Sequence, residues 1–120
     1  MLLTVDIGNT NITLGVFEGK KLHVTFRMTT IQTRTSDEYG MVMCELSEHN
    51  DVKVEEITDV IVASVVPNVM HSLTSAIIKY FHTKPIIIEA GVKMCIRDSD
   101  YPHYQSIVIL YLIVLGHTIL

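Results

Sequence analysis

The sequence has no excess of positive charge: nine Lys and Arg residues stand against thirteen Asp and Glu residues, a formal net charge of -4 at pH 7. Proteins that bind a nucleic-acid backbone usually present a basic surface, so we expect no nucleic acid among the partners. Cys44 and Cys95 lie far apart without CxxC spacing, and the six histidines are scattered. Neither a zinc site nor a disulfide framework is indicated, and Cys44 is expected to be a small apolar residue on a helix face.

Long apolar segments are missing too. The run from Ile107 to Leu115, even when extended to Leu120, falls short of the roughly 20 apolar residues that a membrane-spanning helix needs. The start, Met1 to Asp6, has neither the basic region nor the long apolar region of a signal peptide, and it indicates a strand. We therefore expect a cytoplasmic protein with no membrane partner. Its 120 residues, 48% of them hydrophobic, suit one folded domain with a modest core.

Short β-favouring runs fill the first quarter of the chain. The runs cover Leu2–Asp6, Ile12–Phe17 and Leu22–Met28, and the last of them alternates apolar and polar residues as a half-buried strand does. The turns between them are short, which favours an antiparallel meander of three strands.

The pattern then changes to helices that alternate with strands. Thr35 and Glu38 fit a capping box, which predicts a helix from there to about His49. A near-continuous apolar run at 59–66 predicts a central strand, and helical spacing follows from Pro67 to Tyr80. A fifth strand is expected at 85–89. The order β-β-β-α-β-α-β predicts an α/β fold with a mixed sheet, the ribonuclease-H-like unit of which actin-like ATPases contain two copies.

The segment between the first two strands carries the candidate chemistry. Gly8 allows a positive φ and the close approach of a ligand, and the amides of such a turn form a concave anion site. Asp6, at the end of a buried strand, is expected to hold a hydrated Mg²⁺, which takes only one or two protein carboxylates. The alternative is a plain hairpin turn with Asp6 as a strand-end cap. The candidate site residues are Asp6, Ile7, Gly8, Asn9, Thr10, Asn11, Ile12 and Thr13.

Four strings together resemble one enzyme family. The run from Leu3 to Asn11 is similar to the opening of the type III pantothenate kinases, and further matches lie at 33–39 (TRTSDEY), 63–67 (ASVVP) and 91–93 (GVK). They occur in the family's order over the first 93 residues. The glycine turn alone is shared by actin-like kinases in general, whereas the combination is specific.

The resemblance implies that the complete enzyme phosphorylates pantothenate with ATP, the first step of coenzyme A biosynthesis. It implies that the segment from Asp6 to Thr13 holds the ATP phosphates, with Asp6 facing the metal. It also implies a homodimer that needs Mg²⁺ and a monovalent cation, K⁺ or ammonium. The string from Arg34 to Tyr39 caps a helix whether or not it binds a ligand, and the string from Ser64 to Pro67 indicates only a strand-to-helix exit.

The resemblance ends after Lys93. The family's Gly-Ala-Asp-Arg string, which carries the catalytic aspartate, is absent from the sequence, and the neighbours of Asp98 and Asp100 do not match it. We therefore place no catalytic residue in this chain and expect it to be inactive alone. Residues 1–93 are expected to form the N-terminal actin-like lobe, and residues 94–120 a tail outside the family. Met94 to Ser99 resembles the translation of a sequencing-adapter end, which suggests a junction artefact there; the alternative is a natural divergent tail in which Ile107 to Leu115 forms a buried strand or a short helix.

Two other functions fit part of the same pattern. One is another actin-like sugar or acid kinase, whose acceptor specificity would lie outside this chain. The other is a non-catalytic, nucleotide-binding regulatory protein that keeps the fold. The strings at 33–39 and 63–67 favour the pantothenate kinase over the first, and only the segment with the catalytic aspartate separates it from the second.

Overall fold

The computed structural model describes residues 1–64 and 66–89. In this part of the chain, five strands form one sheet in the order β3-β2-β1-β4-β5. The strands β1, β2 and β3 are antiparallel neighbours, whereas β4 is parallel to β1 and β5 is parallel to β4. The order β-β-β-α-β-α-β predicted along the chain and the mixed sheet are confirmed. The strands span Leu2–Ile7 (β1), Asn11–Glu18 (β2), Lys21–Thr29 (β3), Asp59–Ser64 (β4) and Ile86–Glu89 (β5).

Both predicted helices are present and begin where the sequence places them. Helix α1 (Ser36–His49) follows Thr35, and helix α2 (Pro67–Phe81) has Pro67 in its first turn, where a missing N–H group is harmless. Asn50 caps the end of α1, and the following Asp51 has a φ of 62°. A short 3-10 helix at 54–56, absent from the sequence prediction, leads into β4.

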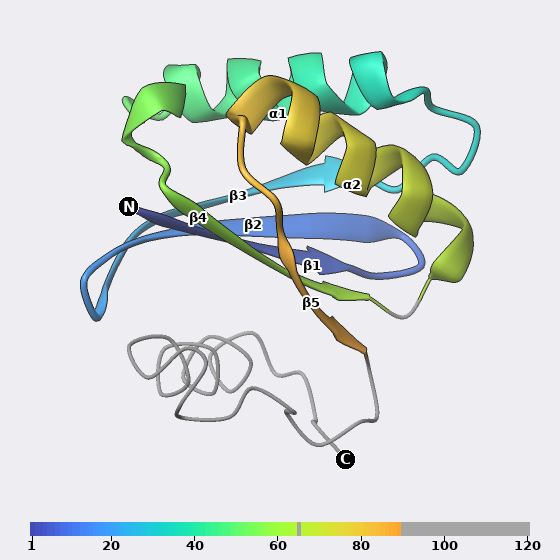
Figure 1. Cartoon of the computed structure of the whole chain (residues 1–120), viewed down its shortest axis with the longest axis horizontal. Helices are drawn as coiled ribbons and strands as arrows, with labels where there is room; N and C mark the ends of the chain where they lie inside the picture. The colour runs from blue at the N-terminus through green and yellow to red at the C-terminus, as the bar shows by residue number, and fades with distance from the viewer. Residues whose placement is uncertain (65, 90–120) are drawn as a thin grey trace.

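The two helices cover the same face of the sheet (Figure 1). The strands direct every second side chain toward them, as the period of two predicts, and this side holds the core. Cys44 lies half-buried against this core on α1, and burial raises the pKa of its thiol, as expected of a small apolar residue. The core residues of this layer include Leu3, Val5, Ile7, Ile12, Leu14, Val16, Phe26, Met28, Val60 and Val62 from the sheet and Tyr39, Met43, Val69, Leu73, Ala76, Ile77 and Phe81 from the helices.

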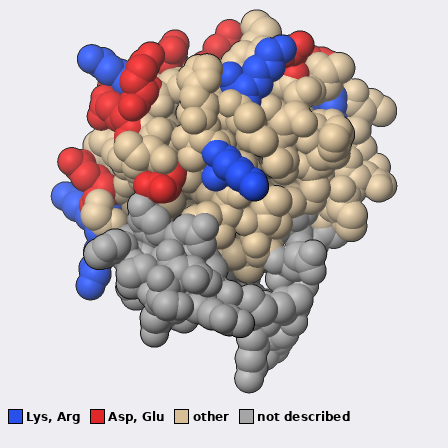
Figure 2. All heavy atoms as spheres, in the orientation of Figure 1, with Lys and Arg blue, Asp and Glu red and all other residues tan. Residues whose placement is uncertain are grey.

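Charged side chains of both signs share the surface. On the face seen in Figure 2, the Lys and Arg side chains are scattered, and several stand beside acidic ones. Within the described residues, neither helix has the length and the apolar character to cross a membrane. Three segments of the sequence analysis lie outside the described residues: the GVK match at 91–93, the tail at 94–120 and, within that tail, the apolar run at 107–115.

A glycine lets α1 and α2 approach closely. A Cβ atom built on Gly40 would lie 2.1 Å from Cδ1 and 2.6 Å from Cγ of the Tyr80 ring. Since Cγ is close to the backbone of α2, the ring cannot swing away without a rotamer change. Gly40 is therefore required in the middle of α1 by contact with the neighbouring helix, despite its low helix propensity.

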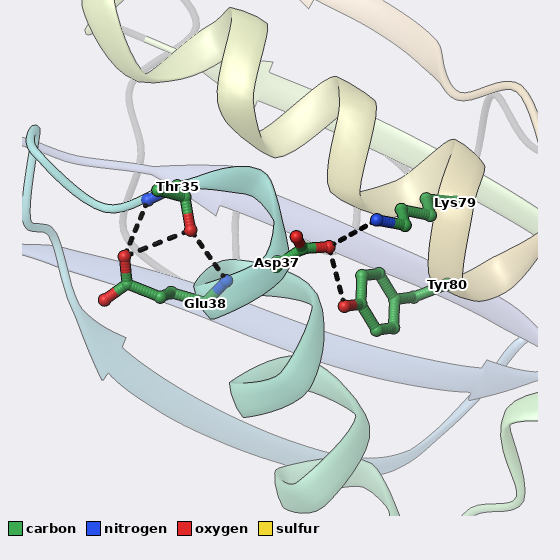
Figure 3. Close-up of polar contacts among 5 residues, drawn as sticks. All are labelled: Thr35, Asp37, Glu38, Lys79 and Tyr80. Carbon is green, nitrogen blue, oxygen red and sulfur yellow. Dashed lines mark hydrogen bonds and ion pairs between the residues drawn. The ribbon is translucent and has the colours of Figure 1, made fainter.

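A carboxylate joins the same two helices at the surface. Asp37 Oδ1 accepts hydrogen bonds from Lys79 Nζ at 2.6 Å and from the Tyr80 hydroxyl at 2.8 Å (Figure 3). The Lys79 hydrogen bond, followed by that of Tyr80, lowers the pKa of Asp37. In the same first turn of α1, the capping box is complete: Thr35 Oγ1 accepts from the Glu38 N–H, and Glu38 Oε1 accepts from the Thr35 N–H. These bonds to Thr35 lower the pKa of Glu38.

Substituting Gly40→Ala should destabilise the chain because the new methyl group meets the Tyr80 ring. Overpacking costs about 1–3 kcal/mol, and the better helix propensity of alanine offsets about 1 kcal/mol of it. We expect the free energy of unfolding, measured by urea denaturation, to fall by up to about 2 kcal/mol. In a Tyr80→Ala background the ring is gone, and the same substitution should stabilise α1. Equal destabilisation in both backgrounds would contradict the contact.

Acid should weaken the junction of the two helices. The folded-state pKa values of Asp37 and Glu38 lie below those of the unfolded chain, so their contribution to stability is present above the unfolded values and is lost as the pH falls through the folded ones. We expect the urea midpoint to decline below about pH 4, and Asp37→Asn to make that decline smaller. Asp51→Asn, an exposed aspartate with a left-handed backbone that asparagine tolerates, is the control and should keep the full decline. An identical pH profile for Asp37→Asn and the unsubstituted chain would exclude this role.

Candidate nucleotide-phosphate site

A tight turn joins β1 to β2 and brings the predicted site residues together. Ile7 pairs with Ile12 and Asp6 with Thr13 in the antiparallel ladder, which leaves residues 8–10 as the connection. The Gly8 N–H donates to the Asn11 carbonyl at 2.9 Å and closes the turn. Ile7 and Ile12 are fully buried in the core, so only their backbone groups are available to a ligand.

Of the two reasons expected for Gly8, a positive φ and the close approach of a ligand, the first is wrong. Its φ lies outside the left-handed region; among the described glycines, Gly19 in the turn between β2 and β3 has the left-handed backbone, with a φ of 62°. A Cβ atom on Gly8 would instead lie 3.1 Å from the Asn11 carbonyl oxygen. The hydrogen bond that closes the turn brings these two residues so near that a side chain would press on the backbone opposite.

The tip of the turn faces solvent. Asn9, Thr10 and Asn11 are exposed, and Gly8 is half-buried. Among the described residues, the backbone N–H groups of Asn9 and Thr10 have no backbone acceptor. Amides at an exposed turn can donate to an external anion, and they carry the positive end of the peptide dipole. The turn can therefore hold a phosphate group without any basic side chain.

Asp6 is the acidic group next to this turn. Its side chain is 5% exposed, and its position in the sheet lies between Thr13 of β2 and Ala63 of β4. Asp6 precedes the carboxyl end of β1 by one residue, and β1 and β4 are parallel. Ligands of open α/β sheets bind beyond the carboxyl ends of such strands, so Asp6 stands at the edge where a ligand is expected.

The donor set fits Mg²⁺ better than a metal that needs a protein cage. Within residues 1–64 and 66–89, no group of three or more His, Cys, Asp or Glu side chains could hold an ion. Mg²⁺ keeps several of its waters and takes one or two carboxylates together with phosphate oxygens. The single carboxylate of Asp6 beside a turn with exposed amides is consistent with that pattern.

The string at 33–39 does not contribute a ligand-binding side chain to the turn. Thr35 and Glu38 cap α1, and Asp37 is occupied by Lys79 and Tyr80 of α2. The capping role expected from the sequence is confirmed. One residue at the turn was missed by the sequence prediction: Thr30, just after β3, donates from its hydroxyl to the Gly8 carbonyl and from its N–H to the Thr10 carbonyl. A lone threonine at a strand end gives no signal by which the sequence could have found it.

Two solved structures share this arrangement of strands and helices. One is a protein from Porphyromonas gingivalis assigned as an N-acetylglucosamine kinase, with a TM-score of 0.56 and 19% identity over 74% of this chain and 34% of that one. The other is the ROK hexokinase from Thermus thermophilus, with a TM-score of 0.53 and 16% identity over 73% of this chain and 34% of that one. At this level of identity the likeness shows the fold alone, and it agrees with the expected actin-like unit.

The sequence comparisons are more specific. A protein described as a type III pantothenate kinase, from Agathobacter rectalis, is 56% identical over 107 residues, which make up 89% of this chain and 41% of that relative. The chain thus spans about two fifths of the length of the relative it matches. A family model described as type III pantothenate kinase matches residues 2–107, a range that extends past the boundary expected at Lys93. The fold, the turn and both matches agree with the sequence motifs, and the chain belongs to the type III pantothenate kinase family.

Proposed function

We propose that this chain supplies the phosphate-binding wall of an enzyme that transfers the γ-phosphoryl group of ATP to the hydroxyl group of pantothenate. The observation that carries the proposal is the turn from Gly8 to Asn11, with its solvent-facing amides beside the buried carboxylate of Asp6. The family and the 56% identity to the Agathobacter rectalis protein supply the substrate. The relative's greater length leaves room for the second wall of the cleft.

In the proposed reaction the turn binds and orients, and it does not take part in bond making. The hydroxyl oxygen of pantothenate bonds to the γ-phosphorus, the bond from that phosphorus to the bridging oxygen breaks, and ADP leaves. The hydroxyl proton passes to a base that we place outside this chain. Catalysis of phosphoryl transfer consists mostly of positioning and charge stabilisation, which the N–H groups of Asn9 and Thr10 provide to the ATP phosphates. Asp6 would hold Mg²⁺ through the water molecules of the ion, and the bound ion would neutralise phosphate charge.

The compartment, the oligomeric state, the monovalent cation and the domain bounds are also proposals. We propose that the complete enzyme is a cytoplasmic homodimer that also needs K⁺ or ammonium, and that residues 1–93 are its N-terminal lobe with residues 94–120 as a tail outside it. The identity to a pantothenate kinase favours this function over another actin-like kinase. If the complete protein binds nucleotide but does not phosphorylate pantothenate, the alternative of a regulatory protein is favoured.

Asp6→Asn should impair turnover in a complete enzyme. We suggest a chimera in which residues 1–93 replace the matching segment of the Agathobacter rectalis protein. The substitution keeps the size of the side chain and removes its charge, so kcat should fall on the order of a hundredfold, and the Mg²⁺ concentration for half-maximal activity should rise. The KM for pantothenate should not change. Asp51→Asn is the matched control, and near-normal kcat and metal dependence for Asp6→Asn would instead favour the strand-end cap.

Gly8→Ala should act on ATP rather than on metal dependence. The added Cβ would lie 3.1 Å from the Asn11 carbonyl oxygen, so the backbone of the turn would have to shift by a few tenths of an ångström. In the same chimera we expect the KM for ATP to rise about tenfold, since one or two hydrogen bonds to phosphate would be lost. Gly19→Ala is the comparison: its left-handed backbone makes alanine unfavourable, but it has open space around it. It should lower the melting temperature and leave the KM for ATP as it was. If the two variants raise that KM equally, the turn has no special role.

A further inference from the structure

Thr30 holds the outer turn by two hydrogen bonds. Its Oγ1 donates to the Gly8 carbonyl at 2.8 Å, and its N–H donates to the Thr10 carbonyl at 2.9 Å. Thr30 directly follows β3, and its side chain is half-buried. The Gly8 carbonyl belongs to the peptide unit before Asn9, and the Thr10 carbonyl belongs to the peptide unit after Thr10. Thr30 therefore constrains the backbone on both sides of the tip of the turn.

These bonds determine where the N–H groups of Asn9 and Asn11 point. A trans peptide unit is planar, with its C=O and N–H on opposite sides. The Gly8 carbonyl and the Asn9 N–H share one plane, so a carbonyl held toward Thr30 directs the Asn9 N–H away from it. The same holds for the Thr10 carbonyl and the Asn11 N–H. Asn9 is exposed, and its N–H has no backbone acceptor among the described residues, so this N–H is available to an external acceptor.

Thr30 is itself held by the start of α1. The carbonyl before it, that of Thr29, accepts from Arg34 Nη1 at 3.2 Å, and the carbonyl after it, that of Ile31, accepts from the hydroxyl of Tyr39. The Tyr39 side chain is fully buried, and the Arg34 guanidinium lies 5.6 Å from the centroid of its ring. The connection from β3 to α1 is therefore fixed on both sides of Thr30. Arg34 and Tyr39 belong to the string at 33–39, for which helix capping explains only Thr35 and Glu38.

We infer that Thr30 is a positioning residue for ATP, which aims the Asn9 N–H at the phosphates and takes its own place from Arg34 and Tyr39. The inference rests on the proposed function, because it concerns the same turn. It adds a residue outside the segment from Asp6 to Thr13 and a role for the string at 33–39. Thr30 touches no reacting atom and acts through the peptide units of Gly8 and Thr10.

The test uses Thr30→Val in the chimera described above. Valine has the shape of threonine without the hydroxyl, so the Gly8 carbonyl loses its donor while the packing stays. We expect the KM for ATP to rise about tenfold, with the KM for pantothenate unchanged. Thr30→Ser, which keeps the hydroxyl, should restore the KM for ATP to within about twofold. Thr25→Val is the control, because Thr25 is an exposed threonine of β3, remote from the turn in the ladder.

The outcomes separate the inference from the proposed function. A chimera without substitutions that shows no ATP-dependent phosphorylation overturns the proposed function and the inference with it. An active chimera in which Thr30→Val lowers the melting temperature but keeps the KM for ATP overturns the inference alone, because a merely structural threonine would behave in that way. If the valine variant does not fold, Thr30→Ala is judged by the same criterion. A rise in the KM for ATP that serine does not reverse also counts against the role of the hydroxyl.

Discussion

Strand β1 is paired on both of its edges, antiparallel to β2 and parallel to β4, and all six of its residues are buried. This double pairing fixes the position of Asp6 and the direction in which the chain leaves the sheet at Gly8. Hydrogen bonds attach the turn to Thr30, and further hydrogen bonds attach the segment around Thr30 to Arg34 and to Tyr39 of α1. The site is therefore rigid because it is built outward from the most constrained strand of the sheet, and a ligand would meet amides that are already oriented.

Much of this could be predicted from local patterns. The alternation of Leu22, Val24, Phe26 and Met28, the capping box at Thr35 and Glu38, and Pro67 at a helix start each follow from rules that act within a few residues, and the structure confirms all three. The mixed sheet also follows, since a meander joins antiparallel neighbours and helical crossovers join parallel ones, but the order of the strands in the sheet was not predicted. The hairpin from Asp6 to Thr13 was recognised as a unit for the same reason, because its chemistry lies in consecutive residues.

The features that the sequence did not reveal depend on residues far apart in the chain. Gly40 is small because the Tyr80 ring lies against it, and Asp37 is bound by Lys79 and Tyr80 of the other helix. Thr30 meets Gly8 only once three strands are in register. The error at Gly8 has a similar source: glycine can serve either an unusual φ or a close approach, and a sequence does not distinguish the two. Only the distance to the Asn11 carbonyl does so.

The two pairings of β1 also differ in when they can form. The antiparallel ladders to β2 and from β2 to β3 join neighbouring segments, whereas the parallel ladder to β4 must wait for α1 and the short 3-10 helix that precede β4. Loop closure favours the local ladders first, and synthesis from the N-terminus acts in the same direction. A chain emerging from the ribosome can thus close the turn from Gly8 to Asn11 as soon as Thr30 is available. Until β4 arrives, the other edge of β1 remains an open apolar strand edge, which is the kind of edge most prone to pair with a second chain.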